Sequence, residues 1–202
     1  MVFSSLEFAL FLPIFLLVYY AVIMREGSRD LLLLVASYFF YMAFYWKYAG
    51  LLGLVTVLDY WLGLTISRTA SPKRRRLLVV LSVISNLSLL GFFKYFNFFA
   101  GEASVVARWF GFHADPVYLH IILPAGISFH TFQSMSYTID VYRRQIPEER
   151  SLVKFAVFVS MFPQLVAGPI VRAAQFLPQL HRTPVVARED LRLGWYLIFL
   201  GL

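Results

Sequence analysis

Long apolar runs separated by short polar segments dominate the chain. They cover residues 6–24, 31–46, 48–67, 77–99, 117–142 and 152–171, and a further run begins at residue 193. A helix needs roughly 20 residues, at about 1.5 Å rise each, to cross about 30 Å of hydrocarbon. The first and fourth runs reach this length, and the second and third are separated only by residues 46–48. We therefore predict an all-α, polytopic transmembrane protein in which 31–46 and 48–67 form two closely apposed helices.

Composition supports the same class. Of the 202 residues, 60% are hydrophobic and 14% are charged, and the mean hydropathy is +0.71. The formal charge of +7 lies mostly in short loops, so topology explains it and no nucleic-acid partner is expected. With no cysteine, disulfide and thiol chemistry are excluded. The first run lacks a basic leader, carries Glu7 and shows no small-residue cleavage site, so we expect a retained membrane segment.

The basic residues of the short loops predict an orientation. SRTASPKRRR, residues 67–76, holds five basic side chains and no acid, so this loop is expected on the cytoplasmic side. Counting crossings back from it places residues 25–30 in the cytoplasm and the N-terminus outside, and counting forward makes 101–116 external. The segment 143–151, RRQIPEERS, mixes both signs and orients weakly.

The last run predicts that the chain is part of a longer protein. LGWYLIFLGL, residues 193–202, gives roughly 15 Å of helix, about half a bilayer. Backbone carbonyls left in hydrocarbon cost several kcal/mol each, so we expect a fragment truncated within a membrane helix.

Polar residues share one face of the segment LPAGISFHTFQSMSYTIDVYR, residues 123–143. His130, Gln133, Ser134 and Tyr137 have the i, i+3, i+4, i+7 spacing of a helical stripe. The opposite side carries Phe129, Phe132, Met135 and Ile139. A polar stripe at membrane depth faces other helices or a wet cavity, so it lines a substrate path or forms hydrogen bonds between helices.

The ionisable residues near and within the apolar runs are expected to have mainly structural roles. His130 has no nearby carboxylate in the sequence, which favours a structural role over general-base catalysis. Asp140 and Arg143 are three residues apart and are expected to form a helix-end ion pair. Asp59 and Lys94 are candidate buried charges with partners on other helices, although Lys94 could instead extend to the headgroups.

The segment FPQLVAGPIVR, residues 162–172, predicts a broken helix. Pro163 and Gly168-Pro169 interrupt helical hydrogen bonding, so a kinked or re-entrant element is expected. Gln164 and Arg172 flank the break and could bind a polar ligand or satisfy the exposed carbonyls. The chain has no P-loop, HExxH or GxSxG motif, and no metal site is expected.

Six stretches together resemble the membrane-bound O-acyltransferase family, in its bacterial alginate O-acetyltransferase branch. They are MVFSSLEFALFLPIF, LLLLVASYFFYMAFYW, LDYWLG, GFFKYFNFF, LPAGISFHTFQSMSYTIDVYR and FPQLVAGPIVR. The likeness covers nearly the whole chain in the same order, and the joint occurrence of GISF, SYTIDVYR and AGPIVR is specific. The D-alanyl transferase of teichoic acid modification is also similar.

The resemblance implies that residues 1–202 are the N-terminal part of one acyltransferase domain of the bacterial inner membrane. Its helices would surround a tunnel through which an acetyl group, donated by acetyl-CoA, reaches an extracellular polysaccharide such as alginate. Periplasmic acetyl-handling proteins would be its partners, and no bound cofactor is implied. The family's histidine motifs, of the types WHISLS and GLWHG, do not occur here, so the fragment alone is expected to be inactive.

The family pattern also assigns places near the tunnel. The matching position of His130 is usually Phe or Tyr, so His130 does not inherit the catalytic role. The candidate tunnel-lining residues are the polar stripe together with Asp140, Tyr142, Arg143, Gln164 and Arg172. Three alternatives stay open: D-alanyl transfer to a cell-envelope polymer, a secondary transporter with broken helices, and a non-catalytic membrane scaffold. A transporter would show an internal repeat, and none is visible in the 202 residues.

Overall fold

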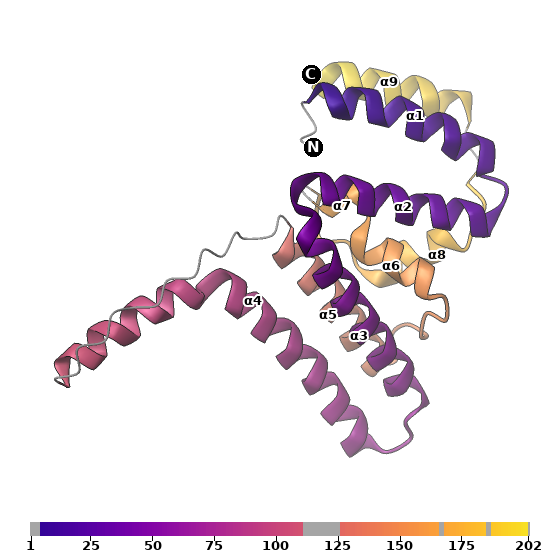
Figure 1. Cartoon of the computed structure of the whole chain (residues 1–202). Helices are drawn as coiled ribbons and strands as arrows, with labels where there is room; N and C mark the ends of the chain where they lie inside the picture. The colour runs from indigo at the N-terminus through magenta and orange to yellow at the C-terminus, as the bar shows by residue number, and fades with distance from the viewer. Residues whose placement is uncertain (1–4, 111–125, 166–167, 185–186, 202) are drawn as a thin grey trace.

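The computed structural model describes residues 5–110, 126–165, 168–184 and 187–201, and every regular element in these ranges is helical. This confirms the predicted all-α fold. The elements, shown in Figure 1, are α1 (Leu6–Val22), α2 (Glu26–Tyr45), the 3₁₀ turn η1 (Trp46–Tyr48), α3 (Ala49–Arg68), α4 (Pro72–Trp109), α5 (Ile127–Tyr142), α6 (Leu152–Ser160), α7 (Phe162–Leu165), α8 (Ala173–Leu180) and α9 (Arg188–Gly201).

Serine caps set the start of two helices. The Ser5 hydroxyl accepts a hydrogen bond from the Phe8 amide at 3.2 Å, and Ser151 accepts one from the Lys154 amide at 3.3 Å. Each hydroxyl satisfies an amide that has no partner within its helix, which stabilises a helix start by about 1 kcal/mol. Polar residues just before apolar runs therefore determine where α1 and α6 begin.

Helices α2 and α3 are separate, as predicted, because η1 breaks the run between them. They meet at a corner and do not lie side by side, so the expectation of two closely apposed helices was wrong (Figure 1). α3 instead packs against α4 and α5, and α2 packs against α6.

Helix α4 is longer than the sequence predicts. Its helical conformation continues over 38 residues, but the helix bends sharply near its middle, and its second half extends away from the other helices (Figure 1). Residues 101–109 are therefore helical, although we expected 101–116 to be an external loop. Residues 111–125, which hold the rest of that loop and the expected start of the next run at 117, lie outside the described residues.

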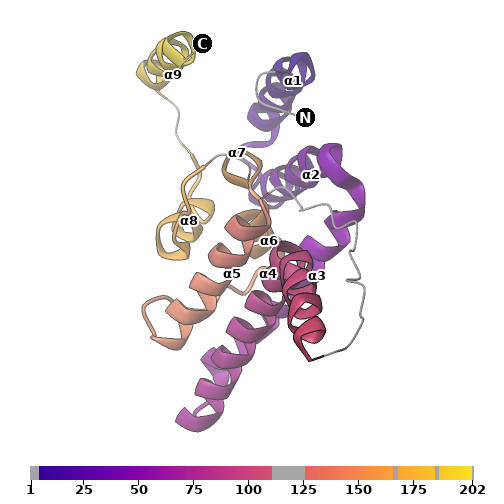
Figure 2. The ribbon, with the colours of Figure 1, turned by 90° about the vertical axis from the view of Figure 1, so that its left-hand side faces the viewer.

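The run 152–171 is broken, as predicted, but the first break comes earlier. α6 ends at Ser160, Met161 adopts an extended ψ of 112°, and Pro163 lies inside the short helix α7. Residues 168–172 are non-helical, which agrees with the expected break at Gly168-Pro169. The sequence analysis missed α8, which follows directly and lies beside α5 and α6 (Figure 2).

Two close contacts hold α5 in place. A Cβ on Gly63 of α3 would lie 2.5 Å from the Tyr137 ring, so only glycine permits this approach. Gly126, before α5, has a φ of 74°, and a Cβ there would overlap the Leu165 carbonyl at the end of α7. Larger residues at these two positions would push α5 away from α3 and α7.

Two helical segments of the described chain are long and apolar enough to cross a bilayer. They are Trp46–Arg68 and Pro72–Ala103, while Leu6–Val22 and Leu152–Leu165 are apolar but shorter. Many large apolar side chains of α1 and α4 are exposed, among them Leu17 at 74% and Phe99 at 64%. Such surfaces need lipid or further protein to cover them.

Candidate functional site

A buried polar junction of α3, α4 and α5 surrounds Asp59. The Asp59 side chain is fully buried, and its carboxylate accepts three hydrogen bonds. Ser82 of α4 donates to Oδ1 at 2.6 Å, Asn86 of α4 donates to Oδ2 at 2.7 Å, and Ser134 of α5 donates to Oδ2 at 2.5 Å. No Lys, Arg or His of the described ranges lies within 4.0 Å of it.

A layer of hydroxyls extends this junction. The hydroxyls of Ser82 and Thr138 lie 2.9 Å apart, and Thr56, one turn before Asp59, donates to the Leu52 carbonyl at 2.7 Å. All of these side chains are buried. The prediction that Asp59 is a buried charge with partners on other helices is confirmed, but the partners are neutral donors and not a cation.

The predicted polar stripe of α5 is buried along its whole length. His130, Gln133, Ser134 and Tyr137 are each exposed by 4% or less, whereas Phe132 on the other side is 39% exposed. The shared face is therefore real. It packs against protein throughout the described chain, so a role in lining a substrate path stays a prediction.

The side chains of Gln133 and Ser37 form hydrogen bonds with backbone groups that lose their helical partners where α6 ends. The Gln133 amide donates to the Phe158 carbonyl at 2.7 Å, and the Phe162 amide donates to the Ser37 hydroxyl at 3.2 Å. In an unbroken helix these two backbone groups would bond to each other. Gln133 and Ser37 thus take the capping role that we had considered for Gln164 and Arg172.

His130 is buried but unpaired. It is 1% exposed, and its Nδ1 has no hydrogen-bond partner within the described ranges. The neighbouring Thr131 hydroxyl is also buried without a partner there. No carboxylate of the described residues forms an ion pair with the ring, so these residues show no general-base arrangement around His130 and favour a structural role for it.

The C-terminal end of α5 anchors the following loop. The Tyr137 hydroxyl accepts a hydrogen bond from the Glu149 amide at 3.0 Å, and its ring packs against Phe155 with centroids 4.6 Å apart. Tyr142 lies under the Arg75 guanidinium at 5.5 Å. The expected ion pair between Asp140 and Arg143 is wrong, because their side chains are not within 4.0 Å and Arg143 is exposed.

Three further candidates lie apart from the junction. Gln164 has a buried Oε1 without a partner in the described chain, and Arg172 is exposed at the start of α8 without capping it. Lys94 was predicted to be a buried charge, but it is exposed on the projecting half of α4, 5.5 Å from the Tyr95 ring. An exposed lysine avoids the desolvation penalty that a buried one carries.

The sequence analysis missed a charged cluster that joins α2, α6 and α8. Lys154 is only 8% exposed, and its Nζ donates to Glu26 and to His181 Nδ1, the latter at 2.8 Å. His181 Nε2 lies 2.7 Å from the Glu149 carboxylate. Lys154 sits in an apolar stretch, LVKFAVFVS, and its partners are distant in sequence, so nothing local revealed the cluster.

Arg29 and Asp30 continue the cluster at the start of α2. The Arg29 guanidinium bonds Asp30 at 2.9 Å and donates to the carbonyls of Leu180 and Arg182. These two carbonyls terminate α8, so Arg29 caps that helix. At the outer edge of the cluster, a hydrogen bond from Lys154 lowers the pKa of Glu26.

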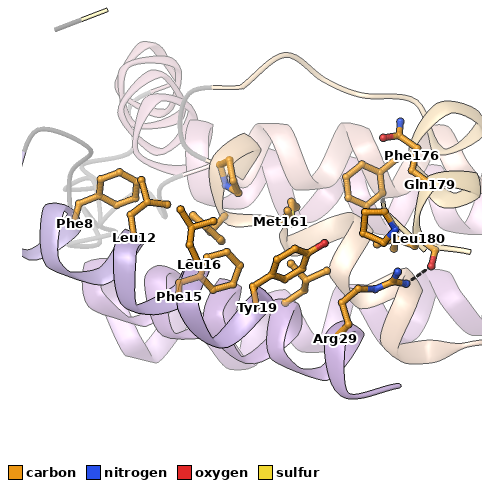
Figure 3. Close-up of a pocket in the computed structure, with 14 residues that line it drawn as sticks. Phe8, Leu12, Phe15, Leu16, Tyr19, Arg29, Met161, Phe176, Gln179 and Leu180 are labelled. Atoms are coloured by element: carbon orange, nitrogen blue, oxygen red, sulfur yellow. Dashed lines mark hydrogen bonds between the residues drawn. The ribbon is translucent and has the colours of Figure 1, made fainter. Parts of the chain in front are cut away.

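A pocket of about 470 Å³ lies between α1 and residues of α2, α7 and α8 (Figure 3). Phe8, Leu12, Phe15 and Leu16 line it along α1, and Arg29 closes the end beside Leu180. The Arg29 donors facing Asp30 and the α8 carbonyls are already engaged. The pocket therefore suits an apolar group better than a sugar hydroxyl.

The polar side chains of the described residues mainly stabilise helix packing and do not form a catalytic arrangement. They contain no group of three His, Cys, Asp or Glu side chains that could hold a metal ion. The buried carboxylate at Asp59 has all of its hydrogen bonds directed to fixed helices, and His130 has no orienting partner. The Asp59 hydrogen bonds lock α3, α4 and α5 together, because satisfied buried polar groups specify one packing.

Known proteins similar to the chain point to one group. It is 47% identical over 190 residues to a probable alginate O-acetylase of Azotobacter vinelandii, a match covering 91% of this chain and 37% of that protein. The probable alginate O-acetylase of Pseudomonas aeruginosa is 45% identical, over 92% of this chain and 36% of the relative. The peptidoglycan O-acetyltransferase of Helicobacter pylori is 34% identical, over 95% of this chain and 41% of the relative.

Fold and composition define the class first: this is an all-α membrane protein. The relatives agree with the motif resemblance, because the identity is high over nine tenths of the chain. The chain is thus similar to alginate O-acetylases and to a peptidoglycan O-acetyltransferase. It spans a little over a third of the length of these relatives. No family model and no solved structure matches it.

Proposed function

We propose that this chain is the N-terminal portion of an integral-membrane O-acetyltransferase that acetylates an extracellular polysaccharide. The observation that carries the proposal is the 47% identity, over 91% of the chain, to a protein named as a probable alginate O-acetylase. The peptidoglycan O-acetyltransferase relative leaves the acceptor open between an alginate-like polymer and a cell-wall glycan.

The reaction transfers acetyl from a thioester, acetyl-CoA, to a sugar hydroxyl. The hydroxyl oxygen attacks the thioester carbonyl, the carbon–sulfur bond breaks, and the thiolate leaving group ends with the proton that the hydroxyl loses. A base must assist this proton transfer. We place that base, a histidine, in the part of the protein beyond Leu202, because His130 lacks an orienting partner.

This chain supplies a rigid set of helices beside which the reaction takes place. The Asp59 junction fixes α3, α4 and α5 to one another, and Gln133 and Ser37 hold the break between α6 and α7. A broken helix with satisfied backbone groups is tolerated at membrane depth where it lies against protein or a wet cavity. We infer that the substrate path runs along this break, close to the unpaired Oε1 of Gln164.

The intact protein would cross the bacterial inner membrane several times. The basic loop at residues 67–76 supports a cytoplasmic position for the end at which α3 meets α4, with the N-terminus outside. Acetyl-CoA would then reach the protein from the cytoplasm, and periplasmic acetyl-handling proteins would receive or direct the acetyl group.

The test uses the intact protein reconstituted in proteoliposomes with acetyl-labelled acetyl-CoA. We expect label on an added alginate-like polymer or on a peptidoglycan fragment, and no label when the histidine of the WHISLS-type motif beyond Leu202 is replaced by alanine. Label from D-alanine in place of acetyl would support D-alanyl transfer. Uptake of a solute without acyl transfer, or a continuing sequence without such a histidine, would overturn the proposal in favour of a transporter.

A further inference from the structure

Two segments at one end of the helices carry a set of exposed basic side chains. One is the connection from α3 to α4, and the other follows α5 (Figure 1). The exposed residues are Arg68, Lys73, Arg74, Arg76, Arg143 and Arg144. Within the described chain none of the six forms an ion pair. We call these six the arginine surface.

Two interactions hold the segments together. Ser67 at the end of α3 donates to the Glu148 carboxylate at 2.6 Å, and Arg75 of α4 donates to the Tyr142 carbonyl at 2.7 Å. Glu148, an acid of this end, is engaged by Ser67 and by Arg150. Arg75 is engaged with α5 and so belongs to the scaffold. The two segments that carry the six cations are therefore held next to each other.

Arg144 has an unusual backbone conformation. Its φ is 59°, the only positive value at a non-glycine residue of the described ranges. It stands at the end of α5, where the Gln145 amide reaches the Asp140 carbonyl at 3.0 Å. Helices that end in this way usually have glycine at this position, because a Cβ is strained there. Arg144 therefore holds a conformation that glycine would adopt more easily.

The depth of the surface identifies the ligand. Arg68 ends one of the two membrane-length segments, and Lys73, Arg74 and Arg76 begin the other. These side chains therefore lie at the level of lipid headgroups. Clusters of four to eight basic residues next to a spanning helix attract anionic lipids, with about 1 kcal/mol for each residue. Guanidinium groups also match phosphate oxygens with paired hydrogen bonds.

We propose that the arginine surface binds the phosphate headgroups of anionic phospholipids and that Arg144 is held in a strained conformation to complete it. This goes beyond acyl transfer and does not depend on it. The lipid would bridge the α3–α4 connection and the end of α5, alongside Ser67–Glu148 and Arg75–Tyr142.

The test measures lipid binding to the intact protein in detergent, by native mass spectrometry and by the rise in Tm on adding phosphatidylglycerol or phosphatidylcholine. We expect a rise with phosphatidylglycerol that exceeds that with phosphatidylcholine and weakens with salt. In the variant Arg74→Gln, Arg76→Gln, Arg143→Gln the affinity for phosphatidylglycerol should fall at least about tenfold. The control is Arg108→Gln, an exposed arginine near the far end of α4, which should bind as wild type.

A glycine substitution separates charge from folding. Arg144→Gly should raise the Tm without lipid, because it relieves the positive φ, and should still lose part of the phosphatidylglycerol response. Arg144→Gln should lose the same response without the gain in Tm. Equal binding of both lipids, an equal loss in Arg108→Gln, or competition by free coenzyme A in place of lipid would overturn the proposal.

Discussion

Two buried polar regions of the chain stabilise their ionisable side chains in different ways. At the Asp59 junction a carboxylate is surrounded by hydroxyl and amide donors, and no cation of the described chain is near. In the cluster around Lys154 and Arg29, cations and anions alternate through Glu26, Asp30 and Glu149. Both regions join helices that are distant in sequence.

Their locations explain the difference. Asp59 lies in the middle of the apolar segment Trp46–Arg68, where every long cationic side chain would itself need to be desolvated. Short serine and asparagine side chains satisfy the carboxylate without adding a second charge. The other cluster lies at helix ends, and His181 in it is 51% exposed, so water is close enough to lower the penalty of several charges.

The comparison teaches that burial alone does not reveal how a charge is stabilised. The stability of the buried Asp59 carboxylate depends on the positions of neutral donors on α4 and α5. The stability of the ionic cluster depends on the positive charges of Arg29 and Lys154. The two regions should therefore respond differently to substitutions that are chemically similar.

The largest effect is expected for Arg29→Met. This change removes the nearer cation of the buried Asp30, leaving only Lys154 at 3.9 Å, and leaves the carbonyls of Leu180 and Arg182 without a donor. Breaking a buried pair in this way costs about 3–5 kcal/mol. The free energy of unfolding of the intact protein, from denaturant titration in mixed micelles followed by circular dichroism, measures it.

Arg150→Met is the matched control for that measurement. Arg150 is 83% exposed and pairs with Glu148 at 3.4 Å, so its loss should cost at most about 1 kcal/mol. Similar losses in the two variants would contradict a structural role for the ionic cluster.

A smaller effect is expected for Asp59→Asn. The asparagine keeps the shape but turns one acceptor into a donor that faces Ser82 or Asn86 and Ser134. A buried group left without a partner costs about 1–3 kcal/mol. Glu102→Gln, on the exposed part of α4, controls for loss of a negative charge. A loss as large as that of Arg29→Met would mean that a cation pairs with Asp59 in the intact protein.

Gln133→Leu should cost about 1–2 kcal/mol, because the Phe158 carbonyl at the end of α6 loses its donor. Gln179→Leu is the natural control, since Gln179 also donates to a backbone carbonyl but is exposed. Equal changes in the two unfolding free energies would show that the break between α6 and α7 does not need Gln133. Faster hydrogen exchange confined to α6 in Gln133→Leu would localise the effect.

The smallest effect concerns pH at the edge of the ionic cluster. The hydrogen bond from Lys154 lowers the pKa of Glu26 below its ordinary value of 4.5. The contact therefore stabilises the folded state above about pH 4.5, and this contribution is lost as the pH falls through the lower folded-state pKa. We expect the Tm of wild type to exceed that of Glu26→Gln slightly at neutral pH and to converge with it in acid. A constant difference down to acid pH would contradict this.

Local patterns predicted much of the fold. The apolar runs located α1, α2 and α3 closely, but α4 extends beyond its run at both ends and α6 ends well before residue 171. The i, i+3, i+4, i+7 spacing identified the buried face of α5. The prolines indicated a broken helix, although Met161 and not Pro163 ends α6. The short helix α8 was missed although Ala173, Phe176, Leu177 and Leu180 have the same i, i+3, i+4, i+7 spacing, because a helix of eight residues is too short to appear as a long apolar run.

Partners of buried groups could not be predicted in the same way. Ser82 and Ser134 lie 23 and 75 residues from Asp59, and Glu26 lies 128 residues from Lys154. Hydrogen bonds at such separations depend on helix packing, which no local pattern contains. The expectation for the Asp140–Arg143 pair failed for the same reason, since adjacency in sequence does not determine which side chains meet.

The sequence by itself determined that this is a helical membrane protein of the alginate O-acetylase-like kind, because hydrophobic periodicity and family motifs are local properties of the chain. Only the tertiary structure decided which polar residues stabilise one another. In the folded chain Asp59 accepts hydrogen bonds from hydroxyls and an amide on α4 and α5. Gln133 donates to the Phe158 carbonyl, which has no helical partner, and Lys154 is buried beside Glu26 and Asp30. The physical reason is that a buried polar group must find a partner wherever packing brings one, and packing is a property of the whole fold.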